Sequence, residues 1–201
     1  MRLQGCGKHA LAVRKDDLYE TPPEAVRALL RHVRLPDPIW EPACGPGAIV
    51  KELRAAGHEV VATDLVDYGA RRCPDSESGR DFLLELAAPP GCATIVTNPP
   101  FKLADDFIRH GLRLVPTVIV LLRLAALEGV GRSDIIDGHL REVLLGKERL
   151  PRMHRGGWTG PKAHGGSGAP FAWFVFCREP SDRGILLRRI SWRDPAVTKA
   201  A

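Results

Sequence analysis

The sequence predicts a doubly wound α/β fold, in which helices cover both faces of a mostly parallel sheet. Apolar segments alternate with helical patterns as far as residue 124, which is the element order of a parallel sheet. These apolar segments are almost uninterrupted, as they are in strands buried on both faces. Two further apolar segments, at residues 172–176 and 185–190, predict extra β structure near the C-terminus, including an antiparallel strand.

The individual elements follow from apolar spacing and from the residues that start and stop them. Pro22 and Pro23 are expected to open the first helix, with Thr21 as its N-cap, and Gly57 is suited to closing a second helix. The remaining elements are expected as helices at residues 48–56 and 103–114, strands at residues 39–42, 58–64, 94–97 and 117–122, a helix and a less regular stretch within residues 125–146, and a loop at residues 150–168.

Length and composition favour one domain. The chain has 201 residues, 44% of them hydrophobic, which suffices for one buried core. We expect an N-terminal arm at residues 1–15 and a single domain at residues 16–201, without a separate target-recognition domain. Neither a membrane span nor a signal peptide is visible, so a cytoplasmic location is expected. The five cysteines are odd in number and widely spaced, which predicts neither a disulfide framework nor a metal site.

Positive charge is concentrated in the second half of the chain. Residues 1–101 carry 12 Lys and Arg against 14 Asp and Glu, a net charge of −2. Residues 102–201 carry 17 against 10, a net charge of +7. Such an imbalance is typical of proteins that bind a polyanion, and it favours a nucleic-acid partner.

A glycine-rich segment and an acidic residue predict a site for a nucleoside cofactor. The segment Glu41-Pro42-Ala43-Cys44-Gly45-Pro46-Gly47 lies between an expected strand and an expected helix, where open α/β sheets bind ligands. Asp64 ends the next strand, where a carboxylate can accept hydrogen bonds from both ribose hydroxyls of an adenosine group. Val50 stands where a dinucleotide fingerprint requires its third glycine, which disfavours a dehydrogenase.

The segment Asn98-Pro99-Pro100-Phe101 predicts the chemistry. Its two prolines fix the backbone and remove two N–H donors, which leaves a rigid turn lined by oxygen acceptors. The Asn98 side chain adds an amide oxygen, and Phe101 offers a flat face to a planar base. An exocyclic NH₂ group can donate both hydrogens to such a turn, which concentrates its lone pair for attack on an electrophilic methyl group. The segment therefore predicts methyl transfer to an exocyclic amino nitrogen.

Together these motifs resemble the S-adenosylmethionine-dependent amino-methyltransferases of DNA, and most of all the small phage- or prophage-type adenine-N6 enzymes. The resemblance covers residues 16–124 and resumes at residues 171–176. It is carried by Asp17-Leu18-Tyr19-Glu20-Thr21-Pro22, the glycine-rich segment, Asp64, Gly79-Arg80-Asp81-Phe82 and Asn98-Pro99-Pro100-Phe101. It implies a Rossmann-like class I methyltransferase fold, S-adenosyl-L-methionine as the cofactor, and DNA rather than RNA as the favoured partner.

The resemblance also implies roles for individual residues. Tyr19, Thr21 and Pro22 would line the methionine end of the cofactor. Its main cradle would be formed by Glu41, Cys44, Gly45 and Gly47, with Asp64 at the ribose and Asp81 and Phe82 at the adenine. The catalytic residues would be Asn98, Pro99, Pro100 and Phe101.

One departure from the family concerns target recognition. DNA-specific members usually carry a recognition domain or a large insertion, whereas here only 100 residues follow the catalytic segment. Cations can contact phosphates, and Trp158 could stack on a base. The candidate nucleic-acid contacts, besides the N-terminal arm, are Arg123, Arg132, Arg149, Arg152, Arg155, Trp158 and Lys162.

Several alternatives stay open at this level. The same chemistry could act on an RNA base or a protein amide, or on cytosine N4 instead of adenine N6. A catalytically inactive nucleic-acid-binding module with the same fold is a further alternative. Carbon-5 methylation of cytosine is disfavoured, because it needs an activated cysteine that follows a proline, whereas Cys73 precedes Pro74 in a polar loop.

Overall fold

The structure is a computed structural model that describes residues 18–69, 71–151, 153 and 166–193. The predicted arm at residues 1–15 lies outside this range, as do Arg152, Arg155, Trp158 and Lys162. In chain order the elements are α1 (Pro23–His32), β1 (Ile39–Glu41), α2 (Ala48–Ala55), β2 (Val60–Ala62), η3 (Phe82–Leu84), β3 (Thr94–Thr97), α3 (Ala104–Leu114), β4 (Thr117–Arg123), η4 (Leu124–Leu127), η5 (Val130–Arg132), α4 (Ser133–His139), β5 (Leu140–Gly146), β6 (Phe171–Cys177) and β7 (Leu186–Ile190).

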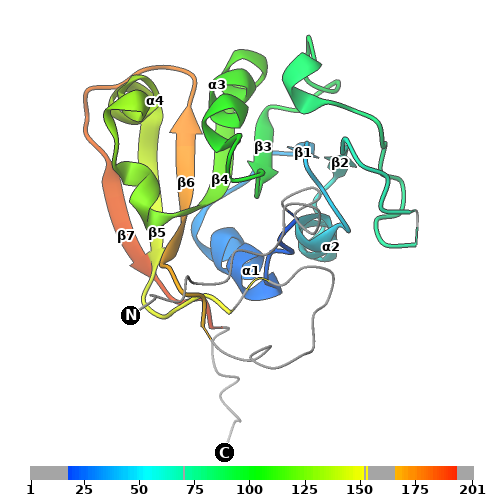
Figure 1. The fold of residues 1–201 in the computed structure, drawn as a ribbon, viewed down its shortest axis with the longest axis horizontal. Helices are drawn as coiled ribbons and strands as arrows, with labels where there is room; N and C mark the ends of the chain where they lie inside the picture. Colours follow the sequence, from blue (N-terminus) through cyan, green and yellow to red (C-terminus); the bar gives the residue numbers. More distant parts are fainter. Residues whose placement is uncertain (1–17, 70, 152, 154–165, 194–201) are drawn as a thin grey trace, which may run out of the picture.

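Seven strands form one sheet in the order β2-β1-β3-β4-β6-β5-β7, with helices on both of its faces (Figure 1). β1 pairs in parallel with β2 and β3, and β3 pairs in parallel with β4. β6 is antiparallel to both β4 and β5, whereas β5 and β7 are parallel. The predicted mostly parallel, doubly wound sheet with an antiparallel strand near the C-terminus is therefore confirmed.

Each face of the sheet has its own hydrophobic core. On one face, Leu29 of α1 packs in the same cluster as Trp173 of β6, and the Trp173 indole N–H donates to the Ala25 carbonyl at 2.8 Å. On the other face, Phe107 of α3 packs in a cluster with Phe174. Burying one large apolar side chain contributes about 1.5–3 kcal/mol, so these two layers hold the helices against the sheet.

Two predictions about local structure were wrong. Thr21 is not the N-cap of α1, because Pro22 occupies that position and no side chain caps the helix. The stretch expected to be irregular after the α4 helix instead forms strand β5, which pairs with β6 on one side and β7 on the other. Its leucines and charged residues suit a helix as well as a strand, so pairing with distant segments decides its conformation.

Within the described ranges, no helix combines the length and the apolar character that crossing a bilayer requires.

Gly111 allows α3 to approach the sheet closely. A Cβ atom at Gly111 would lie 2.9 Å from Cγ2 of Val118 and 3.3 Å from Cδ1 of Ile95. We predict that Gly111→Ala lowers the free energy of unfolding by about 1–3 kcal/mol, because overpacking displaces these neighbours. Urea unfolding measures the change.

The matched control is Gly138→Ala in α4. No heavy atom lies within 4 Å of a Cβ added at Gly138, so alanine should leave stability unchanged or raise it by about 1 kcal/mol. Equal stability of the two variants would contradict the packing argument for Gly111.

Candidate active site

The parallel pairing of β1 with β3 places two predicted motifs side by side. We call residues 41–47 the glycine turn and residues 98–101 the proline corner. Trp40 lies opposite Ile95 in the β1–β3 pair, and both strands end within two residues of this position. Neighbouring strands lie about 4.8 Å apart, so the glycine turn and the proline corner meet at one edge of the sheet. Open α/β sheets bind ligands at this edge.

Asp64 ties the glycine turn to the end of β2. One of its carboxylate oxygens accepts a hydrogen bond from the Gly45 N–H at 2.8 Å, and the other accepts from the Val66 N–H at 2.8 Å. Hydrogen bonds to an ionised group are stronger than neutral ones, and a carboxylate oxygen can accept more than one. Asp64, which was predicted to bind the ribose, therefore also fixes the backbone of the glycine turn.

Gly45 and Gly47 adopt backbone conformations that favour glycine, with φ of 53° and 87°. A Cβ atom at Gly45 would lie 2.9 Å from the Leu18 side chain. A Cβ atom at Gly47 would lie 2.9 Å from the Cys73 sulfur. Both glycines are therefore required by close packing, from the segment before Tyr19 and from the loop after β2. The sequence pattern did not reveal this requirement.

Glu41, the first residue of the glycine turn, has a fully buried carboxyl group. Its exposed fraction is 0%. Oε1 accepts a hydrogen bond from the Ala43 N–H at 3.3 Å, whereas Oε2 has no hydrogen-bond partner among the described residues. Burial raises the pKa of Glu41 to about 8; the nearby Thr97 hydroxyl and the Ala43 N–H oppose this rise, and the charge of Asp64 adds to it. Glu41 is therefore largely protonated at pH 7.

The Asn98 side chain leaves a buried acceptor at the proline corner. Nδ2 donates to the Tyr19 carbonyl at 3.0 Å and to the Met153 sulfur at 3.6 Å. Oδ1 is buried and has no hydrogen-bond partner in the described part of the chain. The Pro100 carbonyl accepts from the Leu103 N–H at 2.9 Å, which closes the turn into α3. The corner thus presents an unsatisfied amide oxygen at the end of β3.

Aromatic side chains surround Phe101. Its ring stacks on Tyr19 with centroids 5.4 Å apart, and Phe171 of β6 lies 6.2 Å away. The Arg123 guanidinium lies 5.2 Å from the Phe101 ring centroid, a geometry suited to a cation–π interaction. The structure therefore brings together Tyr19, Phe101 and Arg123, which were predicted separately. It adds Phe171 and Met153, which the sequence did not identify as site residues.

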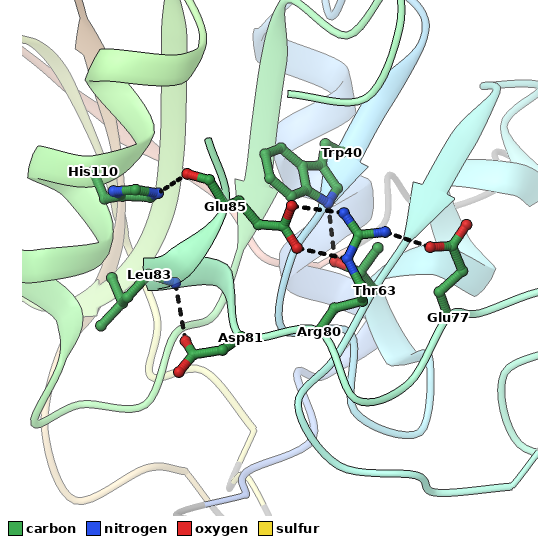
Figure 2. A network of polar contacts seen from close by, with 8 residues as sticks. All are labelled: Trp40, Thr63, Glu77, Arg80, Asp81, Leu83, Glu85 and His110. Atoms are coloured by element: carbon green, nitrogen blue, oxygen red, sulfur yellow. Dashed lines mark hydrogen bonds and ion pairs between the residues drawn. The ribbon is translucent and has the colours of Figure 1, made fainter. Parts of the chain in front are cut away.

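The loop that carries the predicted adenine-binding residues is held by an arginine. Figure 2 shows Arg80 between two carboxylates: it makes a bidentate pair with Glu85 at 2.5 and 2.7 Å and donates to Glu77 at 2.5 Å. Hydrogen bonds from Arg80 lower the pKa of Glu85 below its ordinary value. The backbone of Arg80 donates to the Asp64 carbonyl at 3.0 Å, and the Glu85 carbonyl contacts Nε2 of His110 at 3.0 Å.

Asp81 and Phe82 follow this arginine but face different surroundings. One Asp81 oxygen accepts a hydrogen bond from the Leu83 N–H at 3.0 Å and so caps η3. The Phe82 ring is 3% exposed and packs against Trp40 and Phe107 in the hydrophobic core. A ligand could therefore meet the backbone of Phe82 but not the face of its ring.

The remaining predicted residues lie in varied positions. Thr21 and Pro22 are buried at the start of α1. Arg132 forms an ion pair with Asp105 of α3 at 2.7 Å, which gives this arginine a structural role at the protein surface. Arg149 is exposed. The other four predicted contacts of the basic loop lie outside the described residues.

Comparison with known proteins gives structural matches alone. No protein-family model and no curated sequence matches the chain. A protein from Listeria monocytogenes, predicted to be a class I S-adenosylmethionine-dependent methyltransferase, superposes with a TM-score of 0.55 at 16% identity, covering 87% of this chain and 65% of the Listeria chain. This chain has the fold of the class I methyltransferases. It spans slightly less than two thirds of the length of the Listeria protein.

Two further structures extend this comparison. A protein from Agrobacterium tumefaciens, predicted to be an O-methyltransferase, matches with a TM-score of 0.52 at 17% identity and covers 89% of this chain and 90% of its own. A dimethyladenosine transferase from Plasmodium falciparum matches with a TM-score of 0.52 at 12% identity, and the match covers 82% of this chain and 64% of the Plasmodium chain. At these identities the matches concern the methyltransferase fold and not the acceptor.

A surface hollow of about 570 Å³ lies away from this site, beside β6 and β7. Cys177, which lines it, pairs with Thr117 at the start of β4, so the hollow is at the opposite edge of the sheet from the proline corner. Arg141 also lines it, but its guanidinium is bound to the Gly138 and Glu179 carbonyls. Among the described residues, no group of three or more His, Cys, Asp or Glu side chains could hold a metal ion.

The raised pKa of Glu41 predicts a pH dependence of stability. Between pH about 4.5 and 8 the folded protein keeps a proton on Glu41 that the unfolded chain has released. The free energy of unfolding is therefore highest at low pH, and this contribution is lost as pH rises through the folded pKa. We predict that the free energy of unfolding of Glu41→Gln, relative to wild type, increases by at least about 1 kcal/mol from pH 5 to pH 8.

Urea unfolding at a series of pH values tests this expectation. Glu128→Gln, which removes an exposed carboxyl group, is the control and should follow wild type at every pH. A difference between Glu41→Gln and wild type that does not vary with pH would contradict the assignment of a neutral buried carboxyl group.

Proposed function

We propose that this protein is an S-adenosylmethionine-dependent methyltransferase that methylates an exocyclic amino nitrogen of a nucleobase, with adenine N6 in DNA as the favoured acceptor. The observation that carries the proposal is the position of Asn98 Oδ1. This oxygen is a buried acceptor without a partner among the described residues, and it lies at a strand end next to the glycine turn. An amino group would satisfy this oxygen, because it can donate a hydrogen bond to it.

The residues of the glycine turn suit S-adenosyl-L-methionine. Glu41 Oε2 is a buried oxygen without a partner in the described residues, and the ammonium group of the cofactor's methionine end would favour the ionised form of this carboxyl group and donate to it. Asp64 stands at the end of β2 beside the turn, where a carboxylate can accept from ribose hydroxyls. Asp81 would accept from the adenine amino group. When bound, the cofactor supplies a methyl group made electrophilic by a positively charged sulfur.

The proline corner would align the acceptor nitrogen. Asn98 Oδ1 and the Pro99 carbonyl would each accept one N–H of the amino group. Two such bonds fix the direction of the nitrogen lone pair, and alignment of reacting groups can contribute several kcal/mol, of order 10² in rate or more. The same oxygens stabilise the positive charge that develops on nitrogen.

The cysteines favour direct transfer over a covalent route. Cys44 is the cysteine of the glycine turn, and burial, with the nearby Glu41 carboxyl group, raises the pKa of its thiol above the ordinary value. A thiolate is the nucleophilic form of cysteine, so Cys44 is poorly suited to attack a base. Cys73 packs on Gly47 and is 2% exposed.

A nucleic-acid acceptor is supported by charge. The half of the chain after the proline corner carries the net positive charge, and Arg123 and Arg149 are exposed in it. Cations in such positions contact phosphates. The likeness of the fold to a dimethyladenosine transferase is compatible with an adenine acceptor. An RNA base or a protein amide is the alternative acceptor, and a binding module without catalysis is the alternative function.

We predict that Asn98→Ala keeps affinity for S-adenosyl-L-methionine but loses turnover by at least about a hundredfold, because an acceptor of the amino group is removed while the glycine turn is untouched. Calorimetry measures cofactor affinity and radiolabelled methyl transfer measures turnover. Lys102→Ala, an exposed neighbour, is the control and should retain turnover. A turnover near the wild-type value would refute the role of Asn98.

The acceptor is predicted to be DNA. Purified protein is incubated with tritiated S-adenosyl-L-methionine and with unmethylated DNA, total RNA or protein in separate reactions. We expect label in DNA and, after digestion to nucleosides, N6-methyladenine by mass spectrometry. Label in RNA or protein, or N4-methylcytosine in DNA, would redirect the proposal to that acceptor. Failure to bind the cofactor in calorimetry would favour the non-catalytic module.

A further inference from the structure

The orientation of the Asn98 amide decides what the proline corner can bind. An asparagine side chain has two ends of nearly equal shape, an oxygen that accepts and an NH₂ group that donates. With Oδ1 toward the acceptor base, the corner can take an N–H of the amino group. With the amide turned over, Nδ2 of Asn98 would face the amino group of the base, and neither group could accept a hydrogen bond from the other. The residues that hold the amide are therefore part of the proposed specificity.

Two acceptors hold the amide, and both come from segments distant from Asn98 in the sequence. Nδ2 donates to the Tyr19 carbonyl at 3.0 Å, 79 residues away, and to the Met153 sulfur at 3.6 Å, 55 residues away. A carbonyl oxygen and a thioether sulfur can only accept hydrogen bonds. Both N–H bonds of Nδ2 are thus used. If the amide were turned over, Oδ1 would face the Tyr19 carbonyl and the Met153 sulfur, neither of which can donate a hydrogen bond to it.

Met153 is anchored by its own surroundings. It follows the antiparallel bridge between Pro151 and Gly166, and Leu150 beside this bridge is fully buried. The Leu150 carbonyl accepts from the Ser167 N–H at 2.7 Å. Met153 itself is partly buried against the core cluster that includes α1 and α2. The position of its sulfur therefore does not depend on Asn98 alone.

We infer that Met153 is a positioning residue: its sulfur, together with the Tyr19 carbonyl, holds Asn98 Oδ1 toward the amino group that is methylated. The consequence for turnover rests on the proposed function, whereas the orientation of the amide does not. Met153 touches neither the acceptor nor the cofactor in this scheme. It acts through Asn98, so its loss should lower kcat and leave the KM for S-adenosyl-L-methionine unchanged.

The composition of the chain allows a test at the level of one atom. The chain has two methionines, Met1 and Met153. Replacing both by norleucine exchanges sulfur for a methylene group of similar shape, whereas selenomethionine keeps a polarisable acceptor. We expect kcat of the norleucine protein to fall about two- to fivefold, as for the loss of a weak hydrogen bond. The selenomethionine protein should stay near the wild-type value, and Met153→Leu with Met1 intact should lose kcat as the norleucine protein does.

A second measurement reports on the amide without catalysis. Asn98 is the only asparagine and Gln4 the only glutamine of the chain, so the side-chain amide NH₂ signals in a ¹⁵N–¹H spectrum come from two residues. Asn98→Asp removes one pair and so identifies it. In the norleucine protein, one proton of the Asn98 pair should shift strongly and the other little.

The outcomes separate this inference from the proposed function. An unchanged kcat in the norleucine protein would overturn the positioning role, whether or not the Asn98 signals move. Unmoved signals would overturn the contact itself. If the signals move as expected but wild-type protein methylates no acceptor, the contact is upheld and the proposed function fails.

Discussion

The candidate active site depends on the parallel pairing of β1 with β3. Because side chains alternate along a strand, a shift of one residue in this pairing would turn the side chains of one strand to the opposite face relative to those of the other. The described residues contain five buried side-chain atoms without a hydrogen-bond partner, and three of them belong to Glu41, Thr97 and Asn98. Leaving such a group unpaired costs about 1–3 kcal/mol. Their concentration at the ends of two neighbouring strands is what one expects of a site built for a polar ligand rather than for stability.

The loop after β2 combines anchoring with presentation. Phe82 is fixed in the core, and the pair between Arg80 and Glu85 closes the loop around it. Asp81 lies between these two anchors and is held at a defined position with part of its carboxylate engaged. The fold therefore orders this loop before any ligand binds, which reduces the conformational entropy lost on binding.

Much of the fold could be predicted from the sequence, because β1, β3 and β4 are buried on both faces, and their apolar residues stand out between turn signals. Strand β5 could not be predicted in the same way. Its hydrophobic pattern does not distinguish a strand from a helix, and its partners lie in β6 and β7. The N-cap of α1 was missed for a simpler reason: Thr21 suits a cap, but Pro22 occupies the position.

The candidate site was predictable where side-chain type alone carries the chemistry, as at Asn98 and Asp64. The Tyr19 contact uses a backbone carbonyl, which no residue pattern reveals, and Met153 reaches Asn98 only through the fold. The role expected for Arg132 illustrates the opposite difficulty. In a sequence, an arginine that binds phosphate resembles one that pairs with a neighbouring carboxylate such as Asp105.

The outer strand of the sheet has a consequence for self-association. Among the described residues, β7 is the last strand on one side of the sheet, and its Leu186 and Leu187 are each 56% exposed. An apolar edge strand can template aggregation. Arg189 is exposed on the same strand, and Arg188 is bound to Glu142 of β5. An exposed charge on an edge strand disfavours pairing with the strand edge of another molecule, so Arg189 limits the self-association that the two leucines would otherwise favour.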